Sequence, residues 1–189
     1  MKKIALTLFV VFNLSAVAQK PCEIDTDISD SVGTYKMTKQ YMIFERSFAG
    51  NSTNIFFSLI NTNGILGVEV QVLQRSSDFV KASCFDAGSR IYMQLQNGKI
   101  VSLIHTGPDS CGTYIRDDKN GNNRILTSTF LFAKNNYEDL KVSSVIYMRI
   151  QFAGATNDYP FKTGFVSELD KTMYEPENYF VNYIKCVEN

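Results

Sequence analysis

Residues 90–105 read RIYMQLQNGKIVSLIH, and this stretch decides the fold class. Every second residue from Ile91 to Leu95 is apolar, which is the pattern of a β-strand with one buried face. Asn97-Gly98 follows, and this dipeptide predicts a two-residue hairpin turn because both of its residues adopt positive φ. The apolar run Ile100–Ile104 then returns along the first strand. The stretch therefore predicts an antiparallel hairpin.

A two-residue turn also predicts which residues face one another across the hairpin. On one face the expected pairs are Leu95 with Ile100, Met93 with Ser102 and Ile91 with Ile104; on the other they are Gln94 with Val101, Tyr92 with Leu103 and Arg90 with His105. Both faces then carry apolar side chains. We therefore expect the hairpin to lie inside a sandwich or beneath a helix rather than at a solvated edge.

Six further segments are strand candidates, because they are rich in β-branched and aromatic residues and are bounded by Asn, Gly and Ser. They are Met37–Arg46, Ile55–Ile60, Val68–Leu73, Ile125–Phe132, Val145–Phe152 and Tyr159–Lys162, with turns expected at residues 61–64 and 118–123. A one-turn helix is expected from Asn135 or Asn136, and apolar residues at helical spacing predict a longer helix after Pro176. The predicted fold is mainly β, an antiparallel sandwich or curved sheet with a C-terminal helix.

The first eighteen residues have the composition of a secretory signal peptide. Two lysines precede an apolar run, and Ala16-Val17-Ala18 provides an Ala-x-Ala cleavage site. The run is shorter than the roughly 20 residues that a membrane-spanning helix needs. We expect residues 1–18 to be removed and residues 19–189 to form a single β-rich exported domain, in the periplasm or outside the cell.

Removal of that segment leaves 17 basic and 19 acidic residues, a net charge of −2 with histidine neutral. A chain so close to neutrality lacks the basic surface of a nucleic-acid-binding protein and the basic cluster that binds anionic lipid. Lys20-Pro21 also stand where a lipidated cysteine at Cys22 would require small residues. We expect neither nucleic-acid binding nor a stable membrane anchor.

The four cysteines, an even number in an exported chain, predict two disulfides. We expect Cys84 to pair with Cys111, because the two are placed symmetrically about the predicted hairpin turn. We expect Cys22 to pair with Cys186, because chain ends often lie close together in a domain. The cysteine spacing and the single histidine do not fit a zinc site, and no cofactor is expected.

Two other features are candidate sites. His105, the only histidine, is expected as a surface or half-buried residue at the solvated end of the hairpin rather than in a catalytic role. Asp118 and Asn120 occupy two ligand positions of a calcium loop, but Arg116 and Thr127 stand where its strongest carboxylate ligands belong. We therefore predict no metal site, with Asp118 and Asn120 as candidates for a looser calcium site.

Residues 130–159 carry a resemblance to a protein group. The matching residues are Phe130-Leu131-Phe132, Glu138-Asp139-Leu140, Val145-Ile146-Tyr147-Met148-Arg149-Ile150 and Asp158-Tyr159, together with Cys186 in a C-terminal helix. In these residues the chain is similar to small exported proteins of Bacteroidota that have no assigned function. The resemblance implies an exported location and a β-rich fold, and it assigns no functional residue.

Three functions remain open. The leading expectation is an exported non-enzymatic protein that binds an unknown protein, glycan or small molecule, because no catalytic or phosphate-binding motif is found. The second is a periplasmic hydrolase that uses the loop carboxylates of Asp109, Asp117 and Asp118. The third is a carrier of a lipid or small molecule in an internal cavity. The aromatic residues are expected to fill the core rather than to form a sugar-binding platform.

Overall fold

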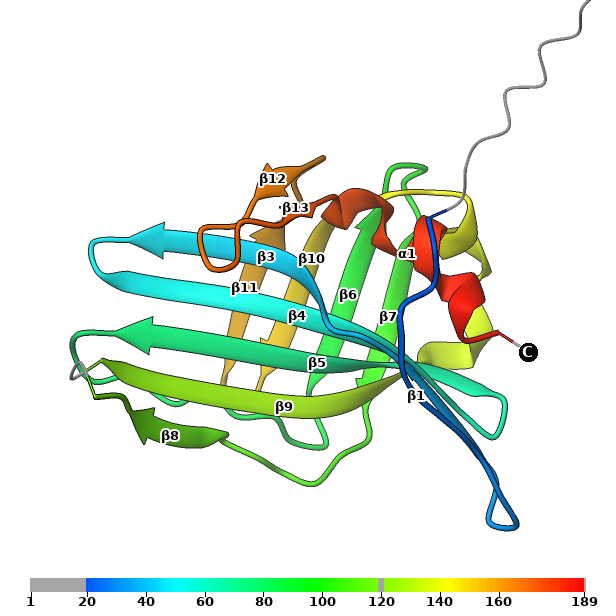
Figure 1. The fold of residues 1–189 in the computed structure, drawn as a ribbon, viewed down its shortest axis with the longest axis horizontal. Coiled ribbons are helices and arrows are strands. Elements are labelled where there is room, and N and C mark those ends of the chain that lie inside the picture. The colour runs from blue at the N-terminus through cyan, green and yellow to red at the C-terminus, as the bar shows by residue number, and fades with distance from the viewer. Residues whose placement is uncertain (1–19, 119–120, 189) are drawn as a thin grey trace, which may run out of the picture.

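The quoted stretch forms strands β6 (Arg90–Leu95) and β7 (Ile100–His105) in the computed structural model, which describes residues 20–118 and 121–188. The other strands are β1 (Ile24–Ser29), β2 (Thr34–Thr38), β3 (Tyr41–Phe48), β4 (Asn51–Thr62), β5 (Ile65–Ser76), β8 (Thr113–Arg116), β9 (Asn122–Phe132), β10 (Val145–Phe152), β11 (Ala155–Pro160), β12 (Phe165–Val166) and β13 (Met173–Tyr174). Eleven of them form one antiparallel sheet in the order β1-β2-β4-β5-β9-β7-β6-β10-β11, with β3 paired to β4 and β8 to β9 (Figure 1). The predicted class, a mainly β fold with a large antiparallel sheet and a C-terminal helix, is confirmed.

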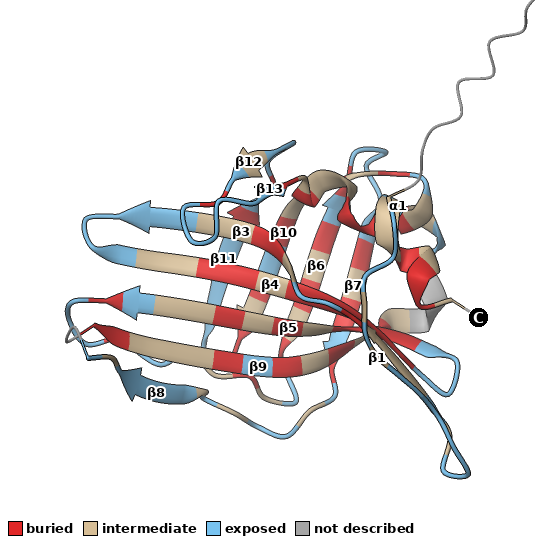
Figure 2. Cartoon of the chain, viewed as in Figure 1, coloured by how far each residue is buried: buried red, intermediate tan, exposed pale blue. Residues whose placement is uncertain are grey.

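The sheet folds over itself into two layers. Strands β3, β4, β5 and β9 cross the front of Figure 1, and β6, β7, β10 and β11 run behind them at a steep angle. The layers are joined where β7 pairs with β9, through Leu103 with Phe132, Ile104 with Leu131 and His105 with Phe130. Buried residues from both layers form one hydrophobic core, and Figure 2 shows buried positions in red on the strands of both layers. This arrangement resembles the orthogonal packing of two sheets, with the corner at the β7–β9 pairing.

The register of the β6–β7 hairpin differs by one residue from the predicted register. Ile91 faces Leu103 and Met93 faces Val101, so the predicted pairs are wrong. Because side chains alternate along a strand, a slip of one residue moves every β7 side chain to the other face. The slip buries Val101 and Leu103 and leaves Ile100 63% exposed. The hairpin therefore has one core face and one solvated face, where two apolar faces were expected.

The turn explains the shift. The backbone N–H of Leu95 donates to the carbonyl of Lys99, and Gly98 N–H donates to Leu95, so the loop has three residues. Gly98 has φ +82°, whereas Asn97 is not among the residues with positive φ. Loop 143–144 supports this longer turn, because Ser144 accepts a hydrogen bond from the backbone of Gln96. A three-residue loop that ends in a left-handed glycine is the next most common hairpin connection.

A second Asn-Gly dipeptide forms the two-residue turn that is typical of this pair. Asn63 and Gly64 have φ of +52° and +84° and connect β4 to β5 with Thr62 facing Ile65. The turn expected at residues 61–64 is therefore confirmed.

The helices are shorter than expected. After Pro176 the chain forms the 3-10 helix η2 (Pro176–Asn178), the α-helix α1 (Tyr179–Tyr183) and the 3-10 helix η3 (Ile184–Cys186), so only five residues are α-helical. The expected one-turn helix is the 3-10 helix η1 (Ala133–Lys141), which begins before the predicted caps and has no side-chain cap. Within the described residues no helix is long and apolar enough to cross a membrane.

Two strand predictions also need correction. The segment Met37–Arg46 is not one strand, because the chain bends between β2 and β3 at Lys39-Gln40. Only the first two residues of the segment Tyr159–Lys162 belong to a strand, where they form the end of β11. In both places residues with high β-propensity extend beyond the last residue that pairs with a neighbouring strand.

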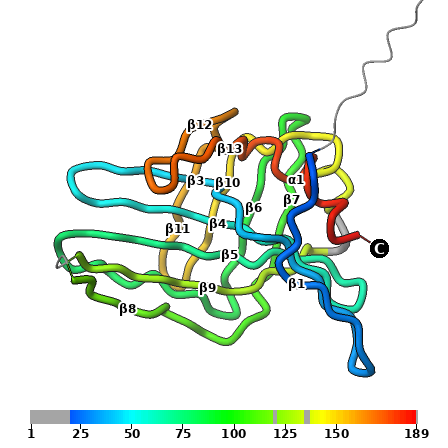
Figure 3. Tube along the Cα trace, in the orientation of Figure 1, coloured from blue at the N-terminus to red at the C-terminus, as the bar shows by residue number. Residues whose placement is uncertain are grey.

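The structure contains both predicted disulfides. Cys22 bonds to Cys186 and joins the N-terminal segment to the last helical turn; Figure 3 shows these two ends of the chain side by side. Cys84 bonds to Cys111 beyond the open end of the hairpin, next to an isolated bridge between Phe85 and Ser110. Two disulfides are compatible with an oxidising compartment. The predicted signal peptide, residues 1–18, lies outside the described residues.

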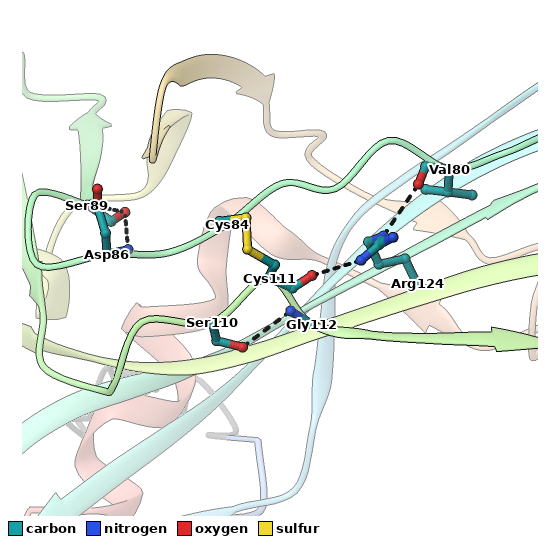
Figure 4. The surroundings of a disulfide bond; sticks show 8 residues. All are labelled: Val80, Cys84, Asp86, Ser89, Ser110, Cys111, Gly112 and Arg124. Carbon is teal, nitrogen blue, oxygen red and sulfur yellow. Dashed lines mark hydrogen bonds between the residues drawn. A yellow bond between two sulfur atoms is a disulfide. The ribbon is translucent and has the colours of Figure 1, made fainter.

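Polar contacts surround the Cys84–Cys111 bond (Figure 4). Arg124 on β9 donates hydrogen bonds to the carbonyls of Cys111, at 3.0 Å, and Val80, at 3.4 Å. Ser110 accepts one from the backbone of Gly112 at 3.2 Å. The two irregular segments on either side of the disulfide are thus tied to the edge of the front layer as well as to each other.

Candidate functional site: a tyrosine-lined cleft

A cleft of about 430 Å³ opens where the N-terminal segment, the bend between β2 and β3, strand β13 and helix α1 meet. Figure 1 shows the N-terminal segment beside α1, and β13 next to the start of the C-terminal helical segment. The lining residues are Lys20, Glu23, Thr38, Lys39, Gln40, Tyr41, Thr172, Met173, Tyr174, Tyr179 and Tyr183. Thr38, Tyr174 and Tyr179 are buried and Lys39 and Gln40 are exposed, so the cleft has a buried floor and an exposed rim.

Local hydrogen bonds create the bend that opens the cleft. The hydroxyl of Thr38 accepts a hydrogen bond from the backbone of Leu59 at 2.9 Å, in a buried position on β4. The backbone N–H of Lys39 donates to the carbonyl of Glu23. The chain therefore leaves β2 at Thr38, and Tyr41 begins a new strand beside the C-terminal helical segment.

A second set of contacts fixes the opposite wall. Glu45 on β3 accepts hydrogen bonds from the hydroxyl of Ser167, at 3.1 Å, and from the backbone of Glu168, at 2.9 Å. These bonds hold the β12–β13 hairpin against β3. Tyr174 on β13 is thereby placed edge-on to Tyr41, with the ring centroids 4.9 Å apart.

Tyr41 is the centre of an aromatic cluster. Its ring centroid lies 5.0 Å from that of Tyr179 and 5.4 Å from that of Tyr183. Tyr179 and Tyr183 are themselves 5.6 Å apart, because residues four apart on a helix share a face. All these distances fall in the range of favourable aromatic pairs. The four rings therefore form a packed wall rather than isolated side chains.

Three of the four hydroxyls are engaged within the protein. Tyr41 accepts a hydrogen bond from the backbone of Glu175 at 2.7 Å, and Tyr174 donates to Asp170 at 2.6 Å. Tyr179 donates to the carbonyl of Phe57 at 3.3 Å. These bonds fix the orientation of the three rings.

Charged side chains of both signs occupy the rim. The ammonium of Lys20 lies 2.6 Å from the carboxylate of Glu175, and that of Lys39 lies 3.5 Å from that of Glu23. The hydrogen bond to Glu175 raises the pKa of Lys20 above its usual value. The rim thus carries two opposite-charge pairs and no net charge.

Burial changes the ionisation of the tyrosines. It raises the pKa of Tyr179, and burial together with the nearby Asp170 raises that of Tyr174, above the usual value near 10. Burial also raises the pKa of Tyr41 and Tyr183. The native cleft therefore keeps its phenols neutral at a pH where the phenols of an unfolded chain ionise.

This difference predicts loss of stability at alkaline pH. The stabilisation is complete below about pH 10, where unfolded tyrosines are protonated, and it falls as the pH rises further because only the unfolded chain releases protons. Urea unfolding at pH 8, 10 and 11 measures the loss, and phenolate absorbance measures the ionisation. Tyr179→Phe should reduce the alkaline loss. A native protein whose tyrosines all ionise near pH 10 without unfolding would contradict this interpretation.

His105 lies in the core, only 5% exposed, and not at the solvated end of the hairpin as expected. Its Nε2 lies 2.6 Å from the hydroxyl of Ser128, and its ring contacts Phe85 and Phe130. Its Nδ1 is buried without a hydrogen-bond partner among the described residues. The expected pairing with Arg90 is wrong, because Arg90 faces Ile104. With no carboxylate on Nδ1, the His–Ser pair lacks the third group that orients a catalytic histidine.

The described residues do not place the calcium candidates in a metal site. Asp118 is exposed, and Asn120 lies outside the described residues. The neighbouring carboxylate of Asp117 accepts hydrogen bonds from Arg75 and from the backbone of Gly121, both at 2.7 Å. Within residues 20–118 and 121–188, no three His, Cys, Asp or Glu side chains gather as metal ligands.

The carboxylates proposed for hydrolysis lie in the chain on either side of β8. Asp109 precedes and Asp117 follows β8, a strand of four residues. Such a strand spans roughly 13 Å at about 3.3 Å per residue. Glycosidase carboxylates lie roughly 5–10 Å apart. The hydrolase hypothesis requires two of these carboxylates at such a separation, and it stays a prediction.

Sequence reasoning did not find the cleft. Tyr179 and Tyr183 lie in the segment predicted as a helix after Pro176, and Tyr41 and Tyr174 lie more than 130 positions apart in the chain. One prediction did point to this corner of the molecule. The expected disulfide was to join Cys22, two residues after Lys20, to the C-terminal helix. No local pattern marks residues that meet only through a disulfide and a strand edge.

No protein-family model matches the chain, and no curated protein or solved structure shows significant similarity to it. The resemblance to exported proteins of Bacteroidota stays a prediction.

Proposed function

We propose that this protein is exported to the periplasm or the extracellular space and binds a small polar ligand, without catalysis, in the tyrosine-lined cleft. The cleft itself carries the proposal. Its volume of about 430 Å³ is within the roughly 300–1,000 Å³ of small-molecule sites. Its combination of aromatic carbon surface and convergent polar groups is also typical of such sites.

The polar rim favours a small polar ligand over a lipid carrier role. Lys20, Glu23, Lys39 and Gln40 line the opening, and a lipid chain in the cleft would leave their polar groups facing hydrocarbon. The alternative of a hydrolase would use Asp109, Asp117 and Asp118, none of which lines this cleft.

Ligand-observed NMR tests the proposal with a fixed set of probes: glucose, galactose, N-acetylglucosamine, cellobiose, choline, phosphate and palmitate. At least one of the polar probes is expected to bind wild-type protein and to lose most of its binding in Tyr183→Ala. Tyr183 is half-buried at the rim, so its removal should leave the fold intact. Tyr92→Ala on the outer face of β6 is the matched control. Failure of all seven probes, or equal binding in both variants, would refute the proposal.

A further inference from the structure

We propose that the ligand of the tyrosine-lined cleft is a neutral saccharide unit rather than an anion or a cation, an inference that rests on the binding function proposed above. Three features support it: the pairing of the rim charges, the engagement of the tyrosine hydroxyls, and the exposure of two adjacent rings.

The charge pairing argues against an ionic ligand. An anion attracted by Lys20 or Lys39 would also approach Glu175 or Glu23, its partner in an ion pair. A cation held by the tyrosine faces would approach the Lys20 ammonium, which its ion pair with Glu175 holds at the rim. Aromatic cages for quaternary ammonium ions rely on ring faces and desolvation, and a fixed ammonium at the opening opposes both. Either ion would therefore meet a fixed charge of its own sign beside the group that attracts it.

A hydroxyl group fits the same rim without breaking a pair. An ammonium has three donors and a carboxylate has several acceptor sites, so each can keep its partner and still bind a ligand hydroxyl. Hydrogen bonds to charged groups are the stronger kind. A sugar hydroxyl both donates and accepts, and a rim that offers Lys39 beside Glu23 satisfies both roles.

The aromatic wall fits the other half of a sugar. Tyr41 and Tyr183 are partly exposed, with ring centroids 5.4 Å apart and planes inclined at 50°. The Tyr41 hydroxyl accepts a hydrogen bond from the backbone of Glu175, which fixes the ring beside Tyr183. A pyranose presents C–H groups on its ring faces and hydroxyls at its edge. The cleft presents aromatic carbon beside a polar rim, which is the complementary arrangement.

The outer face of the sheet provides an internal comparison. Tyr92, Gln94, Ile100, Tyr147 and Arg149 line a second hollow of about 410 Å³ on β6, β7 and β10. There Arg149 holds Asp158 through two hydrogen bonds of 2.7 and 2.9 Å, and Ile100 is 63% exposed. These residues sit on a sheet face without a buried floor. Tyr92→Ala therefore tests whether any exposed tyrosine suffices or the cleft is required.

Isothermal titration with glucose, galactose, N-acetylglucosamine and cellobiose tests the ligand class, with choline and phosphate as ionic competitors. At least one saccharide should bind wild-type protein about tenfold more tightly than Tyr183→Ala, because the variant loses one stacking ring. Tyr183→Phe keeps the ring and should stay within about twofold of wild type, as should Tyr92→Ala. The affinity should change little between low and high salt, because a neutral ligand has no charge to screen.

The outcomes separate this inference from the proposed function. Binding of choline or phosphate that depends on Tyr183, without saccharide binding, would overturn the saccharide assignment and leave a ligand-binding cleft. Saccharide binding that depends on Tyr92 and not on Tyr183 would place the site on the outer face and overturn both. Absence of binding by every probe would also overturn both. Thermal unfolding of each variant checks that the fold is retained.

Discussion

Replacing both Cys22 and Cys186 with serine is expected to lower the free energy of unfolding by about 2–5 kcal/mol. The disulfide links residues 164 positions apart, so it constrains nearly the whole described chain in the unfolded state. The entropy removed from the unfolded chain grows with the length of the closed loop. Urea unfolding of the double variant measures the loss of stability. Titration with the saccharides, choline and phosphate measures whether the cleft still binds a ligand.

The second disulfide supplies the control. Cys84 and Cys111 are 27 positions apart, and on loop length alone their replacement should cost about 1.5 kcal/mol less. The Cys22/Cys186 variant should also lose cleft binding, because the bond joins the segment carrying Lys20 to the helix carrying Tyr183. Retained binding together with unchanged stability would show that the other contacts hold this corner without the disulfide.

Replacing Phe85 with alanine is expected to cost about 3–5 kcal/mol. Phe85 is fully buried although it lies outside every strand. Its ring stacks on Phe152 at 5.0 Å and meets Phe130 edge-on at 5.0 Å. Alanine would leave a cavity between the two layers at the point where β7 and β9 form the corner, and rigid strands on both sides limit how far the cavity can collapse.

Phe79→Ala is the matched control. Phe79 lies in the same connection between β5 and β6 but is 75% exposed, so its loss should change stability by no more than about 0.5 kcal/mol. Thermal and urea unfolding of the two variants give the comparison. Similar losses for both, or a loss below about 1 kcal/mol for Phe85→Ala, would mean that this connection is not part of the core.

The strands were predictable because alternation and β-propensity act over a few residues. Val145–Phe152 was predicted with the bounds it has in β10, and the Asn63-Gly64 turn adopts the conformation its residues favour. Asn97-Gly98 has the same two residues but forms a different turn. There the contact of Gln96 with Ser144 and the burial of Val101 and Leu103 outweigh the local preference.

The candidate site was less predictable than the fold. The disulfide pairing was inferred from symmetry and from the tendency of chain ends to meet, and both inferences agree with the structure. His105 was placed at the surface because its neighbours in sequence suggested a strand end. Its burial depends on β9, whose Phe130 and Ser128 lie more than 20 positions away.

By itself the sequence determined the β-rich class, the turns at Asn63-Gly64 and near Asn97-Gly98, and an even number of cysteines available for pairing, because these follow from short-range periodicity, turn chemistry and composition. Only the tertiary structure decided the hairpin register, the fold of the sheet over itself and the meeting of Tyr41, Tyr174 and Tyr183 around one cleft. The physical reason is that these features minimise exposed apolar area over the whole molecule. The free energy of that burial depends on which distant strands become neighbours, and no local segment carries that information.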